Sequence, residues 1–275
     1  MITRRRPIIV GLTTYNHENL AISVPGLARL GSGFTLVIHN DNPSQKLSRR
    51  TIRRMGYHGK LHIINTSHNI GYLESRLAIL KYVSDKKIKS QWFVFVDDDD
   101  VLLNLNIPSV SSDNFAVIQN MAVIRTRLLD VLRIMRNPLD FTIDNENVCL
   151  VRPHVGLSGT LVRTPAMLRL ANVLSDIVPE LSVVSESLSF RPPIDMMMWS
   201  GLNIVSRSDN ESATPIYMDS VNYIATDLDT APTKYGVAIA PSRDAQSQIK
   251  RAIRRYESII RSALTAAAPV GQEHS

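Results

Sequence analysis

The stretch Trp92-Phe93-Val94-Phe95-Val96-Asp97-Asp98-Asp99-Asp100 places five apolar residues directly before four aspartates. An apolar run without polar alternation is typical of a strand that is covered on both faces, as in a parallel sheet. The aspartates cannot extend such a run, because unpaired carboxylates are costly to bury. The stretch therefore predicts a buried strand whose carboxyl end leaves the core among acidic side chains.

Three further apolar runs precede this strand, and a helix-like stretch follows each of them. The runs are residues 8–12, 34–38 and 61–64, and the helical stretches are residues 19–30, 44–55 and 72–83. Strands that alternate with helices favour a parallel sheet. We therefore predict an α/β fold, in which an open, mostly parallel sheet carries helices on both faces.

The second half of the chain is less regular. We expect helices at residues 121–135, 196–205 and 246–264, and a loop followed by a strand at residues 155–163. A further helix is expected to begin at Thr164-Pro165, because proline is favoured in the first turn of a helix.

Each of the four predicted strands ends in a polar segment. These segments are residues 13–17, 39–43, 65–71 and 97–100. In open α/β sheets, ligands bind outside the carboxyl ends of the strands. We therefore expect the four segments to converge on one cleft.

The four adjacent carboxylates of residues 97–100 repel one another unless protons or a cation offset their charge. Oxygen ligands suit Mg²⁺ or Mn²⁺, which also bind phosphate oxygens. In an extended chain, Asp97 and Asp99 would lie on one side and Asp98 and Asp100 on the other. The run therefore predicts a metal that bridges the protein and a diphosphate, and a solvated acidic turn is the alternative.

The run at residues 93–100 resembles the D-x-D(-D) element of family 2 nucleotide-sugar glycosyltransferases, which have the GT-A fold. Three other segments resemble motifs of that family in the same order. They are Val10-Gly11-Leu12-Thr13-Thr14-Tyr15-Asn16, Asn40-Asp41-Asn42-Pro43, and Asn69-Ile70-Gly71-Tyr72-Leu73-Glu74-Ser75-Arg76. The resemblance implies a nucleotide-sugar-binding half over residues 1–104 and an irregular acceptor-side half over residues 105–240.

The resemblance also implies a role for individual residues. It implies that the nucleotide sugar is bound by Thr13, Tyr15, Asp41, Asn69, Gly71, Arg76, Asp97 and Asp98. Within this set, Tyr15 and Asp41 would bind the base, and Asp97 would reach the ribose or the sugar. Asp99 would ligate Mn²⁺ or Mg²⁺ under the diphosphate, and a UDP-sugar is the favoured donor. Asp227 or Asp229 is a further candidate ligand, with exposed loop acids as the alternative.

Inverting sugar transfer needs a general base that takes the proton of the acceptor hydroxyl. Asp195 in Pro193-Ile194-Asp195-Met196 matches the place of the family's base, and Glu186 is the reserve candidate. Asp195 also suits a helix N-cap, and the two roles are compatible. Gly159 and Trp199 are expected on the acceptor side, with a plain turn and a core position as their alternatives.

The composition and charge of the chain limit the kinds of partner that it is expected to bind. Its 275 residues carry a net charge of +6, and the single cysteine, Cys149, cannot form a disulfide within the chain. Basic residues gather at 43–60, and a basic amphipathic helix is expected within residues 241–275. That helix could pack on its own domain, on a second subunit or on an anionic membrane, while nucleic acid is an unlikely partner. A run long enough to cross a membrane is lacking, which favours a cytoplasmic protein, with contact at the inner face of a membrane left open.

The sequence predicts a metal-dependent inverting glycosyltransferase acting on a saccharide or lipid-linked acceptor. Two alternatives stay open. Asp97-Asp98-Asp99-Asp100-Val101 also satisfies the D-x-D-x-[T/V] motif of haloacid-dehalogenase-type phosphatases, although that motif normally opens its fold. A non-catalytic module that binds nucleotide sugars would share the same motifs.

Overall fold

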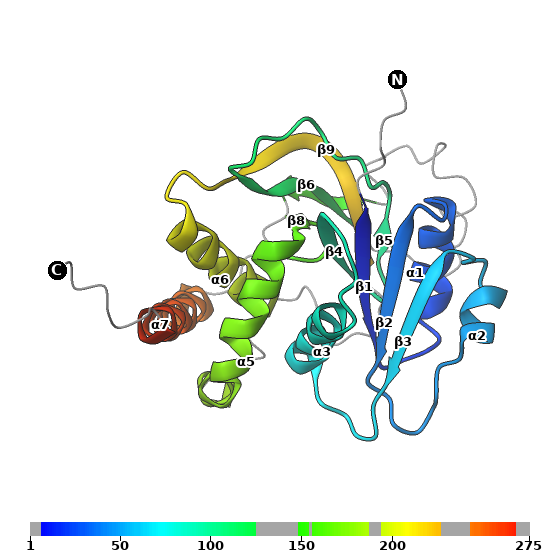
Figure 1. The fold of residues 1–275 in the computed structure, drawn as a ribbon, viewed down its shortest axis with the longest axis horizontal. Helices are drawn as coiled ribbons and strands as arrows, with labels where there is room; N and C mark the ends of the chain where they lie inside the picture. The colour runs from blue at the N-terminus through cyan, green and yellow to red at the C-terminus, as the bar shows by residue number, and fades with distance from the viewer. Residues whose placement is uncertain (1–6, 125–147, 154–155, 187–193, 227–242, 268–275) are drawn as a thin grey trace.

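The computed structural model describes residues 7–124, 148–153, 156–186, 194–226 and 243–267. Its strands are β1 (Ile8–Thr14), β2 (Phe34–Asn40), β3 (Lys60–Asn65), β4 (Trp92–Asp97), β5 (Val101–Leu102), β6 (Asn114–Ile124), β7 (Val148–Pro153), β8 (Leu161–Arg163) and β9 (Thr214–Thr226). Its helices are α1 (Leu20–Arg29), α2 (Arg49–Arg54), α3 (Tyr72–Asp85), α5 (Thr164–Glu186), α6 (Ile194–Asp209) and α7 (Arg243–Ala267). The strands form a single sheet in the order β3-β2-β1-β4-β8-β6-β9-β5, with β7 paired to β6 (Figure 1).

The first four strands lie parallel to one another, and β1 is flanked by β2 and β4. Alternate side chains of these strands enter two separate cores. Ile9 and Phe93 pack on the side of α3 and α5, while Val10 and Val94 pack on the side of α1 and α2 (Figure 1). Because both faces are covered, most positions along β1, β2 and β4 are apolar up to the polar residues at their carboxyl ends. The predicted open, mostly parallel α/β sheet is confirmed.

A glycine in β1 lets the strongest strand carry two phenylalanines on one face. A Cβ atom at Gly11 would lie 2.7 Å from Cζ of Phe93 and 3.0 Å from Cε1 of Phe95. The rings of Phe93 and Phe95 meet edge to face, with centroids 4.7 Å apart. Because Gly11 has no side chain, the two rings can fill the space beside it, beneath the end of β4.

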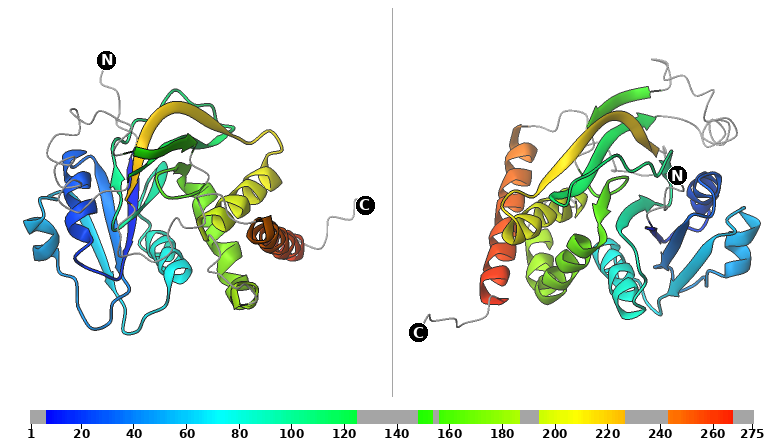
Figure 2. Two further views of the ribbon diagram at one scale, coloured as in Figure 1. Left: turned by 180° about the vertical axis from the view of Figure 1, so that it is seen from behind. Right: turned by 45° about the horizontal axis from the view of Figure 1, so that its top comes forward.

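The second half adds strands that the sequence did not indicate. β6 pairs with β9 in parallel along most of its length and with β7 and β8 in antiparallel fashion, and Figure 2 shows β6 and β9 side by side. The helix expected at residues 121–135 is wrong at its start, because residues 121–124 are the end of β6 and Met121 and Ala122 are buried. The rest of that stretch, residues 125–135, lies outside the described residues.

The helices α5, α6 and α7 form a layer beside the second half of the sheet (Figure 1). Ala252, Tyr256 and Ile260 of α7 are buried at helical spacing, so this helix packs its apolar side on α5 and α6. Gly201 of α6 permits the close approach, since a Cβ atom there would lie 2.8 Å from Cδ1 of Ile260. Packing of the C-terminal helix on its own domain is thereby confirmed. Among the described helices, none is both long enough and apolar enough to cross a bilayer.

Candidate functional site

The polar ends of the parallel strands gather at one edge of the sheet. Thr13 of β1 lies between His39 of β2 and Asp97 of β4 in the strand register. Residues 69–71, which precede α3, reach the same edge, because Asp41 after β2 accepts hydrogen bonds from their backbone. The expected convergence of the strand ends is therefore present.

A buried arginine is the centre of this edge. The side chain of Arg76, from α3, has no exposed surface. Its Nη2 atom lies 3.0 Å from Oδ1 of Asp97 and donates to Oγ of Ser158 at 2.6 Å. Its Nη1 atom forms an ion pair with Asp195, and Tyr72 also contacts the guanidinium. One cation thus joins the end of β4, the loop before β8 and the first turn of α6.

Attraction to two carboxylates and contact with two aromatic rings together stabilise the buried guanidinium of Arg76. Burial alone lowers the pKa of Arg76, but the carboxylates of Asp195 and Asp97 outweigh it, so the pKa is raised above its ordinary value. The guanidinium carbon lies 4.3 Å from the ring centroid of Tyr72 and 4.8 Å from that of Phe95, within the range of cation–π attraction. Arg76 therefore stays charged at neutral pH.

Asp195 and Asp97 contact Ser158 as well as Arg76. The backbone N–H of Ser158 lies 3.4 Å from Oδ2 of Asp195, and its hydroxyl donates to Oδ2 of Asp97 at 3.3 Å. The side chain of Asp195 keeps 26% of its surface exposed, whereas that of Asp97 keeps 12%. Asp195 is therefore the more accessible of the two carboxylates at this site.

The sequence predicted that the four aspartates would alternate along an extended chain, but they do not. The backbone N–H of Asp100 donates to the carbonyl of Asp97 at 3.2 Å, so the chain turns as soon as β4 ends. Oδ2 of Asp98 accepts from the hydroxyl of Thr14 at 2.7 Å, and its Oδ1 lies 3.3 Å from Nδ2 of Asn19. The turn therefore directs Asp97 and Asp98 to different neighbours.

Tyr223 of β9 holds this turn, and the sequence analysis did not identify it. Its buried hydroxyl accepts from the backbone N–H of Asp97 at 3.2 Å and donates to Oδ2 of Asp100 at 2.7 Å. Gly159 makes the necessary room: at a φ of +77°, a Cβ atom there would lie 2.6 Å from the ring of Tyr223. The glycine expected on the acceptor side thus supports the acidic turn, and no local signal could have paired it with Tyr223.

We expect Tyr223→Phe to lower the free energy of unfolding by about 1–3 kcal/mol, because a buried carboxylate loses a hydrogen-bond donor. Urea unfolding measures this change. Tyr15→Phe is the control, since Tyr15 is 55% exposed and its hydroxyl does not contact the acidic turn. Equal losses in the two variants would show that the hydroxyl of Tyr223 does not hold the turn.

Asp41 organises the loop that carries Asn69 and Gly71. Its two carboxylate oxygens accept from the backbone N–H groups of Ile70 and Gly71 at 2.8 and 2.9 Å. Oδ1 of Asn69 also accepts from Gly71 at 2.9 Å, and the φ of +88° at Gly71 is a conformation that favours glycine. These contacts give the loop a fixed shape directly before the helix that carries Arg76.

The other candidates lie in different parts of the fold or outside the described residues. Tyr15 is 55% exposed after β1. Trp199 is partly buried against the core, with its ring centroid 6.0 Å from that of Phe115, and it borders a groove between α6 and α7. Glu186 is the last residue of α5, and Asp227 and Asp229 lie outside the described residues.

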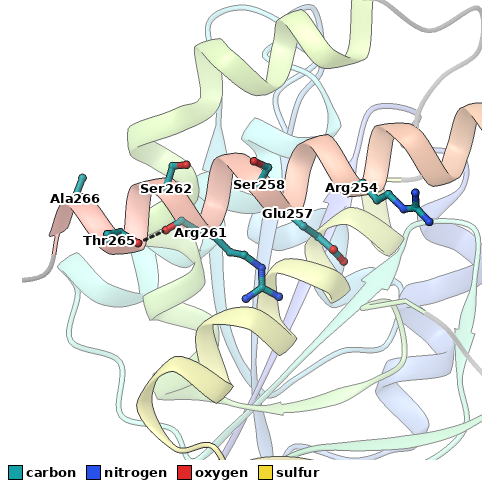
Figure 3. A pocket seen from close by; sticks show the side chains of 7 residues that line it. All are labelled: Arg254, Glu257, Ser258, Arg261, Ser262, Thr265 and Ala266. Atoms are coloured by element: carbon teal, nitrogen blue, oxygen red, sulfur yellow. Dashed lines mark hydrogen bonds between the residues drawn. The ribbon is translucent and has the colours of Figure 1, made fainter.

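A second hollow lies along α7 alone. Figure 3 shows its side chains, which come from a single helix and include Arg254, Glu257 and Arg261. Neither this hollow nor the groove beside Trp199 contains a residue of the acidic turn. These two hollows therefore do not mark the strand-end site, which is defined by its buried polar contacts instead.

The sequence matches no protein-family model and no curated protein. Among solved structures, the chain is similar to residues 1–349 of TarS from S. aureus, with a TM-score of 0.44 and 14% identity over 94% of this chain and 82% of that one. It is also similar to the apo-form glycosyltransferase GlyE of Streptococcus pneumoniae, with a TM-score of 0.36 and 8% identity over 98% of this chain and 66% of that one. At these identities the likeness concerns the fold alone.

Proposed function

We propose that the protein is a glycosyltransferase that moves a sugar, with inversion, from a nucleotide diphosphate donor to a hydroxyl of a saccharide or glycoconjugate. One observation carries the proposal. The buried guanidinium of Arg76 holds together Asp97, at the end of β4, and Asp195, in the first turn of α6. A donor-side carboxylate and a separate, more accessible carboxylate are the groups that such a transfer needs.

Asp195 serves as the general base in this proposal. It takes the proton of the acceptor hydroxyl while that oxygen attacks the anomeric carbon, and the bond to the leaving diphosphate breaks. Arg76 and the backbone N–H of Ser158 orient its carboxylate. Because Arg76 is buried and contacts both carboxylates, it fixes the base relative to the donor side, which is how positioning contributes to the rate.

In this proposal, the loops after β1, β2 and β3 bind the nucleotide end of the donor. Tyr15 is exposed after β1 and offers its ring for stacking on a base. Asp41 already accepts two backbone hydrogen bonds, but carboxylate oxygens can each accept more than one, so a hydrogen bond from a base N–H remains open to it. We favour a UDP-sugar as the donor.

A divalent ion fits this site only if the donor supplies most of its ligands. Within the described residues, no group of three or more His, Cys, Asp or Glu side chains could hold a metal. Mg²⁺ is often bound by one or two carboxylates together with substrate phosphates and water. Asp99, which is 5% exposed in the turn after β4, is the residue that we assign to Mn²⁺ or Mg²⁺. When bound, the ion would offset the charge of the leaving diphosphate.

Donor hydrolysis tests the proposal. Incubation with UDP- and GDP-sugars plus Mn²⁺ should release the nucleotide diphosphate, and Asp99→Ala should slow this release about a hundredfold or more. Asp85→Ala removes an exposed carboxylate at the end of α3 and is expected to leave the rate unchanged. Turnover of a phosphate monoester without nucleotide binding would instead support a phosphatase. Nucleotide binding without turnover on any acceptor would indicate a non-catalytic binding module.

A further inference from the structure

A further polar hollow lies at the end of β2 and β3 that is opposite to the strand-end site. We name it the basic hollow, and it is lined by Ser32, Arg49, Arg53, His58, Gly59, Lys60, Leu61 and His62. Ser32 precedes β2 and Lys60 begins β3, so the hollow lies at the amino ends of these strands. At about 3.3 Å per residue, the length of β2 separates it from the strand-end site by about 20 Å.

The charge of the basic hollow is positive and unbalanced. Three of its lining residues are lysine or arginine, two are histidine, and none is acidic. Within the described part of the chain, Arg49, Arg53 and Lys60 form no ion pair. Cations gathered without counter-charges repel one another, and a bound anion would relieve that repulsion.

The wall of the basic hollow is held in shape by a buried tyrosine. The hydroxyl of Tyr57 lies 3.0 Å from the carbonyl of Phe34 and 3.1 Å from that of Lys60. Burial raises the pKa of Tyr57 to about 12, so the hydroxyl keeps its proton. A Cβ atom at Gly59 would lie 2.5 Å from this hydroxyl, which explains the glycine between His58 and Lys60.

One of the cationic groups, the guanidinium of Arg53, is held in place by the protein itself. Nη2 of Arg53 donates to the carbonyl of Gly59 at 3.1 Å, which holds its guanidinium against the loop. His62 contacts the hydroxyl of Tyr82 through Nδ1 at 3.1 Å. Burial and then the charge of Arg49 lower the pKa of His62, so Arg49, Arg53 and Lys60 carry the charge of the hollow at neutral pH.

We infer that the basic hollow is a binding site for a phosphate group, separate from the site that holds the donor. Arginine forks and a lysine suit the several acceptor oxygens and the double charge of a phosphate. The site is independent of the proposed transfer reaction, because it shares no residue with the acidic turn or with the loops after β1 and β2. Its ligand is a soluble phosphate compound or the phosphate of a lipid headgroup.

Histidine resonances give a local test with the full chain. Sodium tripolyphosphate is titrated by NMR at constant ionic strength and without divalent metal, and the resonances are assigned from single His→Gln variants. His58 and His62 should shift saturably, while His17 and His68, at the opposite end of the strands, should not. Vesicles containing phosphatidic acid form a second arm, in which co-sedimentation of the protein identifies a lipid source and its absence identifies a soluble one.

Paired variants separate a defined site from a general positive field. Arg49→Gln with Lys60→Gln should weaken tripolyphosphate binding about tenfold or more. Arg50→Gln with Arg54→Gln removes the same charge from exposed positions on the same short helix, outside the hollow, and should change binding less than about twofold. Equal weakening by the two pairs would overturn the inference, as would shifts confined to His17 and His68 or no saturable shift.

Discussion

Asp195→Asn is expected to slow sugar transfer by about a thousandfold, which lies within the range measured for the loss of a general base. Asparagine has nearly the same shape and can still accept a hydrogen bond from Arg76, but it cannot take the proton of an acceptor hydroxyl. Nucleotide affinity should therefore change less than about twofold, because the nucleotide loops do not include this residue. Transfer rates and nucleotide titrations on the same preparation measure both quantities.

Asp176→Asn is the matched control, since Asp176 is an exposed carboxylate on α5 and should leave transfer unchanged. The anomeric configuration of the product, read by NMR, should be opposite to that of the donor. Full transfer by Asp195→Asn would place the base elsewhere, and Glu186 would then be the next residue to replace. Retention of configuration would contradict the inverting mechanism.

Arg76→Met is expected to lower the free energy of unfolding by about 3–5 kcal/mol, because the buried carboxylate of Asp97 loses its ion pair with Arg76. The side chain of Arg76 is fully buried, so solvent does not weaken these contacts. Activity should fall as well, since Asp195 loses the group that orients it. Urea unfolding and thermal melts measure the loss of stability.

A double variant isolates the charge itself. Arg76→Met combined with Asp97→Asn removes both members of the buried pair and should be less destabilising than the sum of the two single changes. Additive losses would falsify the view that the pair is energetically coupled. The raised pKa of Arg76 means that its stabilising charge is present below its ordinary pKa and is lost only in strong alkali. Any weakening of the cluster in acid must therefore come from protonation of its carboxylates.

The parallel half of the sheet could be predicted from the sequence because its apolar runs are local and have one physical cause. Residues 8–12, 34–38 and 92–96 are apolar at every position apart from Gly11 and Thr35, as strands covered on both faces must be. Their polar ends could be assigned to one edge, because parallel strands share the direction of their carboxyl ends. The second half lacks such runs, so β6 was partly mistaken for a helix.

Sequence alone determined the parallel sheet, the edge at which its polar residues meet, and the acidic segment on the strongest strand, because all three follow from the order of apolar and polar residues along short stretches. Tertiary structure alone decided the partners at that edge. Arg76 meets Asp195 across 119 positions of the chain, and Tyr223 meets Asp100 across 123. Such contacts depend on how helices and strands pack after folding, and no local pattern encodes which buried carboxylate a distant side chain will reach.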